Sequence, residues 1–244
     1  MPRSARIVLE GIAHHITQRG NYRQNVFEDP EDRIKYLELI KEYSTKYELK
    51  IYAYCLMNNH VHFIVVPERE DSLAMTFKYA HMRYSQYFNR KHRRTGHLWQ
   101  GRFYSCPLDQ EHAISAVKYI ERNPVRAKMV EFPWDYEWSS AGVHVDKSRA
   151  KSRSENTENR DSTQQWDSPR FLPLCDLSNL GFNWNPEGWR EYLGCPDSDD
   201  FLSNIRSNTS AGRPFFSNEK VAEFENALGV SLKRRPRGRP KKGL

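Results

Sequence analysis

Residues 50–66 read KIYAYCLMNNHVHFIVV, two apolar runs that meet at the asparagine pair Asn58-Asn59. Both runs are rich in β-branched and aromatic residues, and asparagines favour tight turns, so we predict an antiparallel hairpin over 50–57 and 60–66. Side chains alternate along a strand, so His60 and His62 share one face. Two imidazoles on one face can bind a single cation, but this short pattern is also typical of histidines held by hydrogen bonds.

Strands and helices alternate on both sides of this hairpin within the first 145 residues. Apolar runs at 12–18 and 102–108 predict two further strands, the first ended by the turn signal Arg19-Gly20-Asn21. Apolar residues at helical spacing predict helices over 31–47, 72–89 and 113–121. This order predicts an α+β sandwich with one helical layer.

The composition changes beyond residue 145. Residues 147–165, KSRAKSRSENTENRDSTQQ, contain only Ala150 as an apolar residue, so 146–168 are predicted to be a disordered linker. Residues 169–232 form a small, mostly helical accessory segment. Its clearest helix is SNEKVAEFENALG (217–229), with Ser217 or Asn218 as the N-cap and Gly229 as the stop. We therefore divide the chain into a domain (1–145), a linker, the accessory segment and a tail (233–244).

The basic charge is concentrated in two places. The chain has a formal net charge of +7, and the tail KRRPRGRPKKGL (233–244) contains seven Lys or Arg and no acidic residue, so the remaining chain is balanced. The acid-free stretch 83–102 holds six more basic residues. Two local patches favour a nucleic-acid partner, with solvated basic faces as the alternative.

The cysteine spacing and the absence of long apolar runs indicate in which cellular compartment the protein is expected. Four widely spaced cysteines without a CxxC pair argue against a zinc ribbon or a disulfide framework and are typical of a reducing cytoplasm. No signal sequence and no apolar run of membrane-spanning length is visible, so we expect a cytoplasmic protein that does not contact the membrane.

Residues 118–130, KYIERNPVRAKMV, supply candidate partners for the histidines. Tyr119 lies at the edge of the apolar stripe of the helix predicted at 113–121, and Asn123 follows about one turn later. A phenol and a carboxamide placed in this way could provide a nucleophile and an oxygen ligand. Asn123-Pro124 is equally suited to cap a new helix or to mark a helix break.

Several motifs occur together in an order that resembles one family. They are HHITQRGNYRQNVF (14–27), YCLMNNHVHFIVV (54–66), GHLWQGRF (96–103), YIERNPVRA (119–127) and YEWSSA (136–141). The chain resembles the REP-associated tyrosine transposases, relatives of single-tyrosine HUH transposases that act on single-stranded DNA. The resemblance covers about 3–145 and resumes at 211–229 and in the tail. The family usually has Met-Pro-Asn-His where this chain has Met57-Asn58-Asn59-His60, a difference that could loosen the turn but spares both histidines.

The resemblance implies a ferredoxin-like HUH fold and a site on its sheet. It implies that His60, His62 and Asn123 bind a metal and that Tyr119 is the nucleophile, cleaving and rejoining repeat-associated hairpin DNA through a 5′-phosphotyrosine. Two imidazoles, an amide oxygen and waters suit Mg²⁺ or Mn²⁺. We expect a monomer associated with the nucleoid. The alternatives are a non-cleaving, domesticated DNA-binding protein and a metal-dependent phosphodiesterase that uses water.

Single-stranded DNA requires a basic groove and platforms for its bases. We expect phosphate contacts from the first basic stretch and stacking on Trp99, although the core is the alternative place for this ring. The tail motif RPRGRPKKG resembles an AT-hook, which enters a narrow minor groove of duplex DNA; a nonspecific basic tail is the alternative. The candidate basic residues are Arg90, Lys91, Arg93, Arg94, Arg102, Arg235, Arg237 and Arg239.

Overall fold

The structure, a computed structural model, describes residues 6–146, 172–229 and 231–232. Its central sheet is antiparallel, with the strand order β2-β3-β1-β4. The strand–helix–strand–strand–helix–strand order and this pairing are those of a ferredoxin-like fold, which confirms the α+β prediction. The elements are β1 Ala13–Arg19, α1 Pro30–Lys46, β2 Leu49–Met57, β3 His60–Pro67, α2 Ser72–Lys91 and β4 Tyr104–Leu108.

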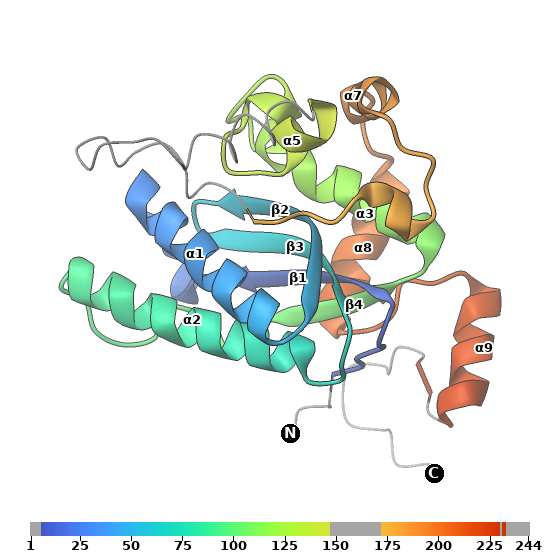
Figure 1. The fold of residues 1–244 in the computed structure, drawn as a ribbon, viewed down its shortest axis with the longest axis horizontal. Coiled ribbons are helices and arrows are strands. Elements are labelled where there is room, and N and C mark those ends of the chain that lie inside the picture. The colour runs from blue at the N-terminus through green and yellow to red at the C-terminus, as the bar shows by residue number, and fades with distance from the viewer. Residues whose placement is uncertain (1–5, 147–171, 230, 233–244) are drawn as a thin grey trace, which may run out of the picture.

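Helices cover both faces of the sheet, whereas the sequence predicted one helical layer (Figure 1). Helices α1 and α2 pack side by side on one face, and α3 (Gln110–Glu121) and α8 (Asp199–Ala211) lie on the other. The reason is visible in the hairpin, because nearly every residue of β2 and β3 is buried. A sheet that is apolar on both faces must be covered on both.

The two helices of the first layer follow directly from their sequences. The Asp29 carboxylate caps α1 by accepting a hydrogen bond from the Asp32 amide at 3.0 Å, and Pro30 occupies the first turn. Helix α2 places Phe77 against Phe63 of β3 and Tyr84 against Tyr36 of α1, and both side chains are fully buried. Truncating a buried aromatic such as Phe77 to alanine costs about 3–5 kcal/mol, so this layer is a major part of the stability.

The segment after residue 171 shares the core of the first 145 residues. The Trp189 side chain is 1% exposed, and its Nε1 donates to Glu121 Oε2 at 3.0 Å. Glu121 also accepts from His144 Nδ1 at 2.6 Å and from the Ser140 hydroxyl.

Two helices of the segment after residue 171 were not predicted, α7 and α8. The remaining elements are η1 Asn21–Arg23, α4 Asn123–Arg126, η2 Pro133–Asp135, α5 Ala141–Val145, η4 Leu177–Leu180, α7 Pro186–Gly194 and α9 Asn218–Leu228.

Helix α9 has the boundaries that its sequence predicts. The Ser217 hydroxyl accepts from the Lys220 amide, and Gly229 ends the helix at a φ of 63°. The predicted linker beyond Asp146 and the tail with Arg235, Arg237 and Arg239 lie outside the described residues. None of the described helices has the length and apolar character that a membrane crossing requires.

Candidate active site

His60 and His62 lie on β3 and face α3, as the strand alternation predicts. Their ring centroids are 4.9 Å apart, and the register pairs them with Arg19 and Thr17 of β1. Tyr119 comes from α3, and its ring centroid lies 5.9 Å from that of His62, nearly perpendicular to it. The sheet and the helix thus bring the predicted nucleophile to the two predicted ligands.

Hydrogen bonds determine which nitrogen each histidine offers. His60 Nδ1 lies 2.6 Å from Asn59 Oδ1, and since a carboxamide oxygen only accepts, this nitrogen carries the proton. His62 Nδ1 lies 2.8 Å from His15 Nε2. Both rings therefore have Nδ1 engaged and Nε2 left for a ligand, the arrangement seen when a second hydrogen bond orients a metal-binding histidine.

Burial keeps these imidazoles neutral, which is the form that binds metals. Burial lowers the pKa of His60 to about 4, with the charge of Arg19 as the second cause. The pKa of His62 is lowered well below its usual value, first by burial and then by His60 and His15.

His15 is a site residue that the sequence analysis missed. Its Nδ1 lies 2.9 Å from Thr209 Oγ1 on α8, and its ring lies edge to edge with that of His62 and nearly coplanar with it, with centroids 5.1 Å apart. Burial lowers the pKa of His15 to about 3. Alternation along β1 puts His15 on the same strand face as Thr17, but only the pairing of Thr17 with His62 places that face beside the β3 histidines.

Tyr119 is enclosed by side chains from α4 and α8. Its side chain is 5% exposed, Arg126 Cζ lies 4.4 Å from its ring centroid, and the Phe201 centroid lies 6.4 Å away. Its hydroxyl forms no hydrogen bond within the described ranges. The phenol is thus held by its ring and its oxygen is uncommitted.

Asn123 lies one turn beyond Tyr119 and is bound to Arg126 rather than acting as a cap. Helix α4 has Arg122 at its N-cap position, and no side chain caps it. Arg126 Nη2 donates to Asn123 Oδ1 at 2.5 Å, and Arg126 Nη1 donates to Asp197 at 2.6 Å. In the described part of the chain, Asn123 Nδ2 is buried without a partner.

These donors fit a divalent cation. Neutral His60 and His62 present two Nε2 lone pairs, and the carbonyl oxygen of Asn123 keeps a second lone pair beside the one used by Arg126. Two imidazoles and an amide oxygen leave coordination positions open, as a catalytic site requires. The metal site predicted from the sequence remains a prediction that this donor set supports.

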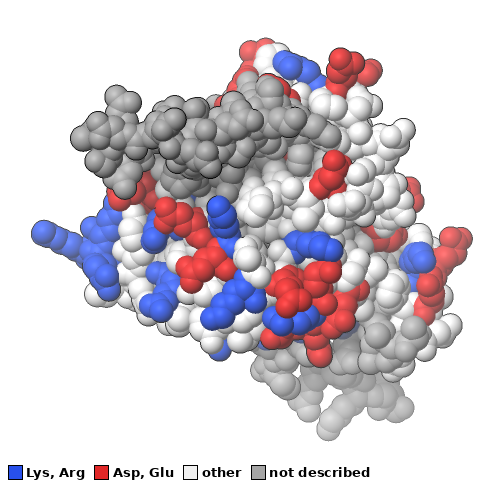
Figure 2. All heavy atoms as spheres, viewed as in Figure 1, with Lys and Arg blue, Asp and Glu red and all other residues white. Residues whose placement is uncertain are grey.

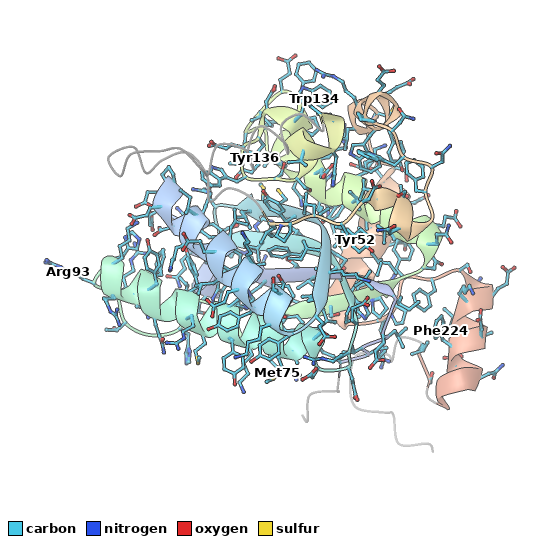
Figure 3. The ribbon with its side chains drawn as sticks, viewed as in Figure 1. Tyr52, Met75, Arg93, Trp134, Tyr136 and Phe224 are labelled. Atoms are coloured by element: carbon cyan, nitrogen blue, oxygen red, sulfur yellow. The ribbon has the colours of Figure 1, made fainter. Side chains whose placement is uncertain are left out.

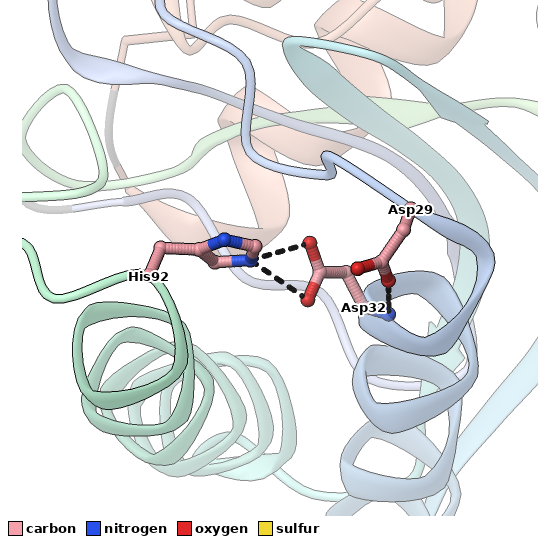
Figure 4. A group of neighbouring side chains, drawn as sticks. All are labelled: Asp29, Asp32 and His92. Carbon is pink, nitrogen blue, oxygen red and sulfur yellow. Dashed lines mark hydrogen bonds and ion pairs between the residues drawn. The ribbon is translucent and has the colours of Figure 1, made fainter.

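A second cluster that could hold a cation lies between α1 and α2 (Figure 4). Oxygen and nitrogen atoms of Asp29, Asp32 and His92 lie within 4.8 Å of one another. The Lys91 ammonium already sits 2.9 Å from Asp29, 2.8 Å from Glu31 and 3.1 Å from Asp32. Asp29 is the N-cap of α1, and Glu31 and Asp32 lie in its first turn, where the helix dipole favours negative charge. We interpret the cluster as an ionic contact between two helices.

The acid-free stretch 83–102 is partly neutralised by acidic residues from other parts of the chain. Lys91 is committed to the cluster just described, and Arg94 pairs with Glu28 at 3.1 Å. Basic and acidic side chains are interleaved on the face formed by α1 and α2 (Figure 2). Arg90 is exposed, and Arg93 extends into solvent beyond α2 (Figure 3).

Trp99 and Arg102 have different surroundings. The Trp99 side chain is 8% exposed and packs on His81 and Tyr36, with ring centroids 4.6 Å and 5.9 Å away. Its ring is therefore a core ring in this structure, which is a correction to the stacking role expected for it. Arg102 is exposed and lines a groove beside β4 together with Arg6, Tyr104 and Arg213.

Known proteins resemble this chain in sequence and structure. The family described as IS200-like transposase matches residues 9–123. A REP-associated tyrosine transposase, solved bound to a REP hairpin, shares 19% identity at a TM-score of 0.48, covering 70% of this chain and 99% of its own. A candidate transposase from Deinococcus radiodurans R1 shares 19% identity at a TM-score of 0.34, covering 50% and 97%. No curated protein matches. Residues 9–123 contain the four strands, both histidines and Tyr119, so the part of the chain that is similar to the IS200-like transposases includes the candidate site.

Proposed function

We propose that this protein is a metal-dependent, REP-associated transposase that cuts and rejoins single-stranded hairpin DNA through Tyr119. The observation that carries the proposal is the position of Tyr119, whose ring lies 5.9 Å from that of His62 and whose oxygen is uncommitted among the described residues. The protein would act as a monomer, with the tail on adjacent duplex DNA.

In the proposed reaction, one set of residues binds the metal and Tyr119 attacks the phosphate. A divalent cation, Mg²⁺ or Mn²⁺, held by His60, His62 and Asn123 would supply positive charge to the scissile phosphate. The Tyr119 oxygen attacks phosphorus; the bond from phosphorus to the 3′-oxygen breaks as the new bond forms. The phenol loses its proton and the 3′-oxygen gains one, which leaves a 5′-phosphotyrosine and a 3′-hydroxyl. A second 3′-hydroxyl can reverse the step without ATP, because the phosphodiester is conserved.

Access to Tyr119 requires side chains to move. Only 5% of the Tyr119 residue is exposed, so the DNA must displace groups that touch it. Phe201 of α8 and Arg126 of α4 are two of these groups. Both lie after the residues that the family profile matches.

The decisive experiment is a search for the covalent intermediate. Labelled DNA hairpins with unpaired flanks are incubated with the protein and Mn²⁺ and analysed on a denaturing gel. We expect a protein–DNA adduct with the wild type and none with Tyr119→Phe, which lacks only the hydroxyl. Cleavage without an adduct would favour a water nucleophile, and binding without cleavage would favour the non-cleaving DNA-binding protein.

A further inference from the structure

The short helix η1 displays Tyr22 to solvent. This side chain is 94% exposed, whereas the next most exposed large apolar side chain in the described part of the chain, Tyr104, is 44% exposed. This short helix is a tight turn that follows β1 without an intervening loop. An aromatic ring in this position contributes little to the core, because almost none of its surface is removed from water.

The backbone under Tyr22 is strained and tightly held. Tyr22 and Arg23 have φ values of 50° and 61°, a left-handed conformation that residues with a Cβ rarely adopt. The Asn21 amide donates to the Leu98 carbonyl at 2.8 Å, and Gln24 Nε2 donates to the same carbonyl at 3.1 Å. Two successive strained residues persist only where the surroundings fix them, and such sites are often functional.

Gly20 shows how closely this turn is packed. A Cβ at this position would lie 2.3 Å from the Gln24 carbonyl oxygen, so a larger residue would push the turn out of place. The backbone of this turn therefore holds Tyr22 in a fixed position.

A single amide side chain joins the turn to the active site. Asn59 Nδ2 donates to the Arg23 carbonyl at 3.2 Å, while Asn59 Oδ1 accepts from His60 Nδ1 at 2.6 Å. The Gly20 amide also donates to the Asn59 carbonyl at 2.8 Å. The turn that displays Tyr22 is thus two hydrogen bonds away from a predicted metal ligand.

The charges beside Tyr22 point to a nucleic acid. Arg19 and Arg23 flank the ring in sequence and are exposed, and neither forms an ion pair with any carboxylate among the described residues. The Arg19 guanidinium donates to the amide oxygen of Gln100 from Nε and Nη2, at 3.4 Å each. An exposed aromatic between two unpaired arginines is the combination that binds single-stranded DNA, in which bases stack and phosphates pair.

We propose that Tyr22 is a stacking platform for an unpaired base close to the scissile phosphate, with Arg19 and Arg23 on the flanking phosphates. The inference rests on the proposed function, because it assigns the DNA strand a path past His60. It adds a residue that contacts the substrate by its ring and takes no part in bond breaking.

Binding measurements on single variants test the contact first. Fluorescence anisotropy with a labelled hairpin carrying unpaired flanks should show about 5- to 150-fold weaker binding for Tyr22→Ala, the range that stacking of one base provides. Tyr22→Phe should bind within about twofold of the wild type, because it keeps the ring. Met82→Ala, which removes an exposed side chain from α2 on the other face of the sheet, is the control and should change nothing.

Abasic sites identify the partner base. Each unpaired nucleotide is replaced in turn by an abasic one. At the stacked position, the abasic DNA should weaken wild-type binding as much as Tyr22→Ala does, with no further loss when both changes are combined. Additive losses at every position, or Tyr22→Ala binding within twofold of the wild type, would overturn the inference.

Two further measurements separate folding and the chemical step from stacking. Tyr22→Gly suits the left-handed backbone, so it should raise the melting temperature while weakening binding as Tyr22→Ala does. Adduct formation at Tyr119 is measured on the same DNA. No adduct with the wild type would reject the cleavage function and leave the stacking result standing, whereas an adduct with Tyr22-independent binding would reject the stacking platform alone.

Discussion

His15 Nε2 lies 2.8 Å from His62 Nδ1, and the two imidazole planes are 7° apart. His15 Nδ1 in turn lies 2.9 Å from the Thr209 hydroxyl. With both rings neutral, His62 keeps an Nε2 lone pair when its Nδ1–H donates to His15 and the His15 Nδ1–H donates to Thr209. A residue of α8 therefore helps to fix the tautomer of a predicted metal ligand on β3.

Replacing His15 by Phe should weaken Mn²⁺ binding by about 10- to 100-fold, the usual effect of removing a hydrogen-bond partner behind a metal ligand. Phe keeps an aromatic ring in this position and removes the hydrogen-bonding nitrogen. Calorimetric titration with Mn²⁺ measures the affinity, and His60→Ala/His62→Ala gives the baseline without a site. Thr209→Val should have a smaller effect in the same direction. Wild-type affinity in His15→Phe would show that His62 needs no such partner.

Asp197→Ala should destabilise the fold by up to about 3 kcal/mol, because it leaves two partly buried arginines without their shared anion. The Asp197 carboxylate is 4% exposed and lies 2.6 Å from Arg126 and 3.3 Å from Arg122. Urea unfolding provides the measurement. Asp200→Ala, on the exposed first turn of α8, is the matched control and should cost at most about 1 kcal/mol. Equal losses in the two variants would show that the buried pairs contribute nothing special.

The fold should lose stability between pH 7 and pH 5. Burial lowers the pKa of His14 to about 4 and that of His81 to about 3. Both folded-state values lie below the unfolded value of about 6.5, so the unfolded chain binds more protons as the pH falls through this window. Each histidine then removes about 2 kcal/mol at pH 5 relative to neutral pH.

The control for this pH dependence is His81→Gln. Glutamine keeps an acceptor for the Tyr36 hydroxyl, which lies 2.9 Å from His81 Nε2, and does not titrate. Urea unfolding at several pH values should give a flatter profile for this variant. Identical profiles for the variant and the wild type would contradict the assignment to His81.

Deleting residues 233–244 should weaken DNA binding and flatten its salt dependence, because these residues hold the entire formal excess of +7. If most of the seven charges contact phosphate, the salt slope should fall by about 3 to 6 units. Cleavage at saturating DNA should change little. A minor-groove hook predicts a larger loss on A·T-flanked duplexes than on G·C-rich ones, and a plain basic tail predicts equal losses. An unchanged slope would mean that the tail does not touch the DNA.

The sequence was sufficient where structure is local. The hairpin around Asn58-Asn59, the shared face of His60 and His62, and the ends of α9 follow from alternation and capping. The turn forms with asparagine at position 58, where Asn58 Oδ1 accepts a hydrogen bond from Arg33 at 2.7 Å.

What the sequence could not provide depends on contacts between distant residues. His15 joins the site only through the pairing of β1 with β3, and the basic stretch around Arg94 is neutralised by acids near α1. Helix α8 was missed because DDFLSNIRSNTSA is rich in residues with low helix propensity. The signals that could have revealed it are its ends, Ser198 as the N-cap and Gly212 in the left-handed conformation.

Glu121 binds side chains from both parts of this chain, so the two parts should be inherited together. Its fully buried carboxylate binds His144 and Ser140 before the predicted linker and Trp189 after it. A recombination event that exchanged the C-terminal segment for an unrelated one would remove the Trp189 donor, at a cost of about 1–3 kcal/mol for the unsatisfied acceptor. The same event would remove Thr209 from His15 and Asp197 from Arg126. Exchange of either part by recombination should therefore succeed only when the two parts are transferred together.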